Sequence, residues 1–197
     1  MEESKMIIRG GRIHDGNGRI YESDILVKDG QIVKIAKDIK DGEETVVDAT
    51  NKEIFPGFIQ TLSFWGINGS ASEIRPSSQD NDELSNPITP ELDVRYAFNG
   101  HAATTQQLGA FGLTTIGVTP TDNNLFGGAM AVFEVDGNNS FKMCLKSYAG
   151  MKASVSEKVK NSYKAKAAPQ TKMWIFQKLE EELRKASVYK IEDGKEK

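Results

Sequence analysis

A polar loop after residue 118 carries the side chains whose types and spacing best suit chemistry. It follows an apolar stretch, residues 113–118, that we predict to be a strand. The side chains in question are Thr119, Thr121, Asp122 and Asn123. Hydroxyl, carboxylate and amide groups gathered at the carboxyl end of a strand could contact a substrate. The pair Gly127-Gly128 would also let backbone N–H groups approach an anion. The same residues are good turn formers, and a plain connection between strands explains them without a ligand.

Metal-ligating side chains are sparse in this chain. It has two histidines and one cysteine, whereas a zinc site takes three or four such ligands at short spacings. His14 and His101 have no His or Cys partner at ligand spacing, so we expect surface or hydrogen-bonded imidazoles. Cys144 has no histidine near it in the sequence and is expected to be a small apolar residue rather than a nucleophile. We expect no bound cofactor.

The first part of the chain, residues 1–54, is predicted to be a small β-sandwich-type segment. Two β-rich runs, 25–28 and 31–35, flank Asp29-Gly30, and this dipeptide tolerates the positive φ angles of a type I′ hairpin turn. Residues 13–20 are predicted to form a second turn and residues 44–50 a further short strand. No helix is expected here.

The remainder, residues 55–197, is predicted to be an α/β layer with parallel strands. A helix start is predicted at Thr89-Pro90 and a helix end at Gly112. Residues 171–189 form the clearest helical pattern. Its apolar residues recur every three or four positions and are predicted to be a packing face. They are Met173, Phe176, Leu179, Leu183 and Ala186.

The stretch 55–66, FPGFIQTLSFWG, is predicted to be a buried strand opening this region. A β-rich segment followed by a Pro-Gly-apolar strand resembles the amidohydrolase superfamily, and most of all its imidazolonepropionase-like and dihydroorotase-like members. The family pattern Pro-Gly-apolar-Ile-Asp-x-His-x-His is matched at Pro56, Gly57, Phe58 and Ile59. The resemblance implies a β-sandwich followed by a TIM-like barrel. It also implies a divalent metal, usually zinc, and hydrolysis of C–N bonds in cyclic amides and related compounds.

The departures from this pattern bear on activity. The two histidine positions of the family fall on Leu62 and Phe64, and the aspartate position falls on Gln60. Side chains at alternate strand positions share a face and can bind one metal together, but Leu and Phe bring no lone pair. A TIM barrel takes about 250 residues, more than follow Ile54, so an incomplete TIM-like barrel is expected. The family's first step, lowering the pKa of metal-bound water, then has no basis in this chain alone.

Three functional hypotheses follow. The first is a truncated amidohydrolase-family pseudoenzyme without independent catalysis. The second is a hydrolase that is active only when another chain completes it, and the third is a non-catalytic binding or regulatory subunit. A partial barrel exposes strand edges and apolar faces, so either a homo-oligomer or a completing chain is expected as partner.

The amino-acid composition narrows the classes of protein to which this chain could belong. The 197 residues are 38% hydrophobic and 27% charged, which is typical of a globular protein. The net charge is −3 and the basic residues are scattered, which argues against nucleic-acid binding. No apolar run reaches the roughly 18 residues of a membrane span. With no leader-like segment and a single cysteine, a cytoplasmic location is expected.

Overall fold

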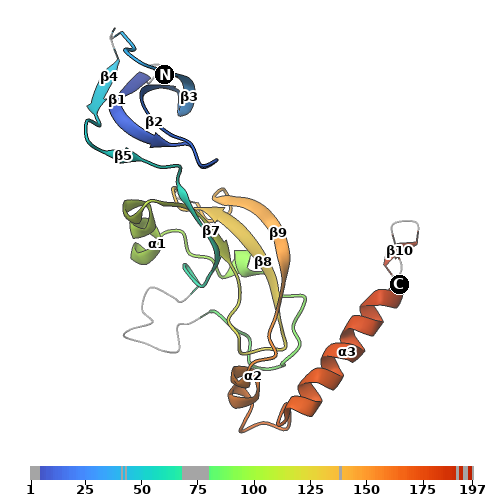
Figure 1. Cartoon of the computed structure of the whole chain (residues 1–197). Coiled ribbons are helices and arrows are strands. Elements are labelled where there is room, and N and C mark those ends of the chain that lie inside the picture. The colour runs from blue at the N-terminus through green and yellow to red at the C-terminus, as the bar shows by residue number, and fades with distance from the viewer. Residues whose placement is uncertain are drawn as a thin grey trace. The chain divides into compact units, whose positions relative to one another are not determined.

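The protein forms a mixed α/β structure, here a computed structural model that describes residues 5–40, 42, 44–67, 80–137, 139–189, 191–192 and 195–196 (Figure 1). Its chain divides into two compact units, Met1–Phe58 and Ile59–Lys197. The division at residues 54 and 55 inferred from the sequence stays a prediction.

Unit 1 is built on one five-stranded sheet. Its strands are β1 (Lys5–His14), β2 (Ile20–Lys28), β3 (Gln31–Ala36), β4 (Thr45–Asp48) and β5 (Glu53–Ile54). Their order is β3-β2-β1-β4, with β5 also paired to β1. Strand β1 runs antiparallel to β2 and parallel to β4 and β5. The described residues of this unit form a single sheet, so the second layer of a sandwich stays a prediction.

The predicted hairpin at Asp29-Gly30 is confirmed. Strands β2 and β3 pair antiparallel, with Lys28 opposite Gln31. Asp29 has φ 49° and Gly30 has φ 77°, as a two-residue turn with both central φ angles positive requires. The turn predicted over residues 13–20 is confirmed as well, because His14 lies opposite Ile20 in the β1–β2 pair.

Unit 2 is built on a four-stranded sheet in the order β6-β7-β8-β9. The strands are β6 (Phe58–Ser63), β7 (Leu113–Val118), β8 (Phe126–Glu134) and β9 (Cys144–Ala153). The expected parallel pairing is wrong for β7, β8 and β9, which pair antiparallel. The connections from β7 to β8 and from β8 to β9 contain no crossover helix. Parallel neighbours need a crossover of a dozen or more residues, so these short connections produce hairpin-like pairing.

The helices of unit 2 are mostly short. They are η2 (Val94–Tyr96), α1 (Ala103–Gln107), η3 (Leu108–Phe111), α2 (Glu157–Ser162) and α3 (Lys172–Val188), followed by the strands β10 (Ile191–Glu192) and β11 (Lys195–Glu196). Gly112 has φ 79° and ends η3, which confirms the predicted helix end. Among the helices that the structure describes, none combines the length and apolar composition that a bilayer-spanning helix needs.

The predicted helix start at Thr89-Pro90 is wrong. The Thr89 hydroxyl donates to the Phe126 carbonyl at 3.1 Å, and Ile88 forms a parallel bridge with Phe126. The segment is therefore held extended beside the start of β8. The nearest helical turn, η2, begins after Asp93, whose carboxylate accepts from the Arg95 backbone N–H.

Two predictions of burial are also wrong. The β6 strand, expected to be buried, is the edge of its sheet, and the side chains of Ile59 and Leu62 are 67% and 58% exposed. On α3, the expected packing face is largely exposed, with Phe176 at 53% and Leu183 at 56%. The helix is anchored instead through Ile175, which is buried against Leu125 and Val159.

Candidate functional site

The loop between β7 and β8 begins with a residue that ties it to the sheet. Thr119 is 1% exposed. Its backbone N–H donates to the Ser63 carbonyl at 3.1 Å, and its hydroxyl donates to the Pro120 carbonyl at 3.2 Å. The Ser63 hydroxyl in turn donates to the Gly117 carbonyl at 3.0 Å. Thr119 therefore fixes the end of β7 against β6 and presents no free group to a ligand.

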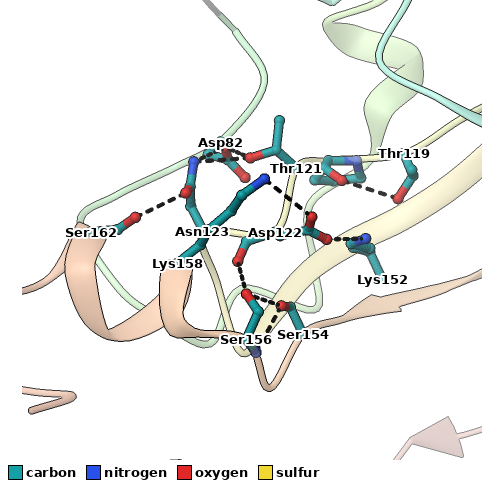
Figure 2. Close-up of polar contacts among 11 residues, drawn as sticks. Asp82, Thr119, Thr121, Asp122, Asn123, Lys152, Ser154, Ser156, Lys158 and Ser162 are labelled. Carbon is teal, nitrogen blue, oxygen red and sulfur yellow. Dashed lines mark hydrogen bonds and ion pairs between the residues drawn. The ribbon is translucent and has the colours of Figure 1, made fainter.

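Thr121 and Asn123 converge on Asp82, which lies far away in the sequence (Figure 2). The Thr121 hydroxyl donates to an Asp82 carboxylate oxygen. The Asn123 side-chain amide donates to the same oxygen at 2.8 Å and to the Thr121 hydroxyl at 2.9 Å. The Ser162 hydroxyl of α2 donates to the Asn123 amide oxygen at 2.9 Å. This network joins three segments of unit 2.

Asp122 makes different contacts, with the cations that follow β8 in the sequence (Figure 2). Its carboxylate lies 2.6 Å from the Lys152 ammonium and 3.6 Å from that of Lys158. The hydrogen bond from Lys152 holds the pKa of Asp122 below its ordinary value. The structure therefore brings together only two of the four predicted residues, Thr121 and Asn123, and gives Asp122 a separate ion-pair role.

A buried pair next to this loop was missed from the sequence. Asn124 is fully buried, and its amide oxygen accepts from the Tyr163 hydroxyl at 2.7 Å. The Asn124 amide nitrogen donates to the Glu83 carbonyl at 2.8 Å. Burial, with the nearby Asp82 and Glu83 carboxylates, raises the pKa of Tyr163 to about 12. A buried amide whose groups are satisfied in this way is a structural clamp rather than a reactive centre.

The glycines at the start of β8 serve packing within the chain. Gly128 has φ 120°, and a Cβ built on it would lie 2.6 Å from the Leu92 carbonyl oxygen. The N–H of the next residue, Ala129, donates to that same oxygen at 2.7 Å. The close approach that a glycine permits is thus used by the backbone at Leu92, and the anion contact considered from the sequence is not built here.

A cavity of about 620 Å³ lies beside the Asp82 network. Its carboxylates are those of Asp80, Asp82, Glu83, Glu91 and Asp93. Burial raises the pKa of Asp82, outweighing the hydrogen bonds from Thr121 and Asn123 that act to lower it. A carboxyl whose pKa is raised by burial is a candidate functional group of this region. The surrounding negative charge disfavours anionic ligands.

Leu62 and Phe64, at the positions of the family's metal-binding histidines, are both apolar and differ in their surroundings. The Leu62 side chain is exposed at the edge of the sheet, whereas Phe64 packs against the core cluster that includes Phe98 and Phe133. In unit 1, the His14 ring lies 2.5 Å from a Glu53 carboxylate oxygen. Within the residues that the structure describes, no group of three or more His, Cys, Asp or Glu side chains could hold a metal.

Comparisons with known proteins give partial matches. No protein-family model matches the chain. A dihydroorotase from Thermoanaerobacter sp. (strain X514) is 42% identical over 55 residues, 28% of this chain and 13% of that protein. A 5-methylthioadenosine/S-adenosylhomocysteine deaminase from Thermococcus onnurineus (strain NA1) is 34% identical over 56 residues, with the same shares.

The fold match is more extensive than the sequence matches. The crystal structure of an amidohydrolase from Thermotoga maritima MSB8 superimposes with a TM-score of 0.78 and 25% sequence identity, over 93% of this chain. The matched part is 49% of that protein, so the chain spans about half of its length. The fold is therefore similar to that of an amidohydrolase over this part of its length. These partial matches support a relationship to the amidohydrolase superfamily.

Proposed function

We propose that this chain is a non-catalytic member of the amidohydrolase superfamily, one that does not by itself perform the metal-dependent hydrolysis of C–N bonds typical of the family. The proposal rests mainly on the identity of the residues at the end of β6. Leu62 and Phe64 occupy the positions of the two metal-binding histidines in the family pattern. Aliphatic and phenyl side chains have no lone pair to offer zinc, so the residues present do not fit the metal.

The surroundings of these residues support the proposal. Phe64 is partly buried and packs against the core cluster of unit 2, so at this position an apolar ring stands where the family pattern has an imidazole. The acidic cavity near Asp82 offers carboxylates, but Thr121 and Asn123 already occupy one Asp82 oxygen. Among the described residues, no group of three or more His, Cys, Asp or Glu side chains is placed to hold a replacement metal.

A second function has one specific observation in its favour. Strand β6 is a sheet edge with exposed Ile59 and Leu62, and such an edge is a template for pairing with another strand. A second chain docked there would make this protein a binding or regulatory subunit, or would complete a barrel with its own catalytic groups.

The test compares the wild-type chain with two variants, Leu62→His/Phe64→His and Leu62→Ala/Phe64→Ala. The alanine pair removes the apolar bulk without adding ligands, so it isolates the effect of imidazole. We expect no tightly bound zinc in the wild type or the alanine pair, any gain of zinc affinity only in the histidine pair, and no hydrolysis of a panel of cyclic amides and imides by wild type. Wild-type hydrolysis that a chelator abolishes would refute the proposal.

A further inference from the structure

Helix α3 leaves most of its length uncovered. Its first turns are anchored by the buried Ile175, with Trp174 and Leu179 half-buried against the same cluster. Beyond Leu179 no residue of the helix is buried within the described part of the chain. A helical segment of this length without a packed face is only marginally stable in water. A partner surface would therefore stabilise the uncovered part of α3.

The uncovered surface is a shallow groove along one side of the helix. It is lined by Phe176, Leu179, Glu180, Leu183, Arg184 and Ser187. Residues at these three- and four-residue spacings share one face of an α-helix. Two large apolar side chains of this groove, Phe176 and Leu183, are more than half exposed. The face therefore combines apolar knobs with two opposite charges, one turn apart.

The charges on the groove differ in their pairing from the other charges of α3. Lys178 is paired with Glu181 at 2.7 Å, and Lys185 with Glu182 at 2.8 Å. Within the described residues, the Glu180 carboxylate and the Arg184 guanidinium take part in no such ion pair. One acidic and one basic group thus remain available beside the apolar residues.

We propose that this face is a self-association surface, on which α3 packs antiparallel against α3 of a second copy about a two-fold axis level with Glu182. An α-helix rises about 1.5 Å per residue. Glu180 and Arg184 lie two residues on either side of the axis, so Glu180 of one copy comes level with Arg184 of the other. The two-fold symmetry repeats this pair, and a second ion pair forms without any further residue.

The same axis places the apolar side chains favourably. Leu183 lies one residue from the axis, so the two Leu183 side chains are offset by only about 3 Å along the helices and meet at the centre. Phe176 and Ser187 lie six and five residues from the axis on opposite sides. Each Phe176 ring therefore packs over the small Ser187 side chain of the other copy, which leaves room for it.

A second copy of the chain is favoured over an unrelated partner because the charges on this face of α3 are complementary to themselves. Glu180 and Arg184 lie at equal distances on either side of Glu182. In an antiparallel pair of α3 helices, each Glu180 therefore faces an Arg184 of the other copy. A single pair of helices buries less surface than a standard protein interface. The association is accordingly weak and depends on protein concentration. The proposal is independent of whether the chain is catalytic.

The test uses sedimentation velocity of the full chain over a wide concentration range. Wild type should shift from monomer to dimer as its concentration rises. Glu180→Arg and Arg184→Glu each place like charges opposite one another in both pairs, so each should weaken dimerisation at least about tenfold. Lys185→Glu reverses a charge that faces Glu181 and Glu182 on the same helix. It should leave the dimer unchanged.

Mixing the variants gives the decisive result. When Glu180→Arg and Arg184→Glu chains are combined, both reversed pairs become attractive, so a heterodimer should form from two chains that do not self-associate. The doubly substituted chain should dimerise like wild type. Circular dichroism checks that every variant keeps its helix content. A wild type that stays monomeric at all concentrations, or variants that fail to associate on mixing, would overturn the proposal, as would binding to another protein only.

Discussion

Replacing Tyr163 with phenylalanine tests how unit 2 holds the loop after β7. The Tyr163 hydroxyl donates to the Asn124 amide oxygen at 2.7 Å, and Asn124 is fully buried. Tyr163→Phe keeps the ring, which is 1% exposed, and leaves the Asn124 oxygen buried without its donor. Leaving a buried acceptor unsatisfied costs about 1–3 kcal/mol. For a protein of this size each kcal/mol lowers Tm by about 2–4 °C.

The assay is urea unfolding followed by tryptophan fluorescence, with thermal unfolding as a second probe. Tyr148→Phe is the matched control, because Tyr148 is 57% exposed and its change should lie within about 0.5 kcal/mol of wild type. Asn124→Ala and the double variant complete a cycle, in which we expect a coupling of about 0.5–3 kcal/mol. If Tyr163→Phe and Tyr148→Phe destabilise equally, the clamp contributes nothing and the reasoning fails.

Three further predictions address other contacts of unit 2. Because the pKa of Tyr163 is raised to about 12, the unfolded state loses this proton first, so stability should fall between about pH 10 and 12. Urea unfolding of Tyr163→Phe at high pH should not show the part of this fall in stability that comes from Tyr163. Gly128→Ala combines φ 120° with a clash at the Leu92 carbonyl and should cost about 1–3 kcal/mol. Gly109→Ala, with open space around it, should change the free energy of unfolding by less than about 1 kcal/mol. Asp122→Asn should cost less than about 1 kcal/mol by chemical unfolding at pH 7. Because the pKa of Asp122 is lowered in the folded protein, the difference from wild type should shrink as the pH falls below the ordinary aspartate pKa of about 4.

Features set by local backbone chemistry were predictable from the sequence. The hairpin at Asp29-Gly30 and the helix end at Gly112 each depend on residues that accept positive φ angles. The resemblance to the amidohydrolase superfamily was also predictable, because the Pro-Gly-apolar strand and the β-rich segment before it are local in sequence. These signals need no knowledge of what packs against them.

Features set by distant contacts were not predictable. Thr89 and Pro90 have the local chemistry of a helix start, but the Phe126 carbonyl holds Thr89 extended. Asp82 lies about forty residues before Asn123, and nothing in the sequence links the two. The apolar spacing on α3 and the composition of β6 indicate which side chains can pack. They do not indicate whether a surface covers them.

The zinc content of the purified 197-residue chain tests the central claim most directly. Mass spectrometry of the metal after exposure to excess zinc and desalting measures the stoichiometry of tightly bound ions. With Leu62 and Phe64 at the family's histidine positions, we expect a stoichiometry near zero for wild type, equal to that of Leu62→Ala/Phe64→Ala. One or two zinc ions per wild-type chain would contradict the account, because the metal centre would then be present without these ligands.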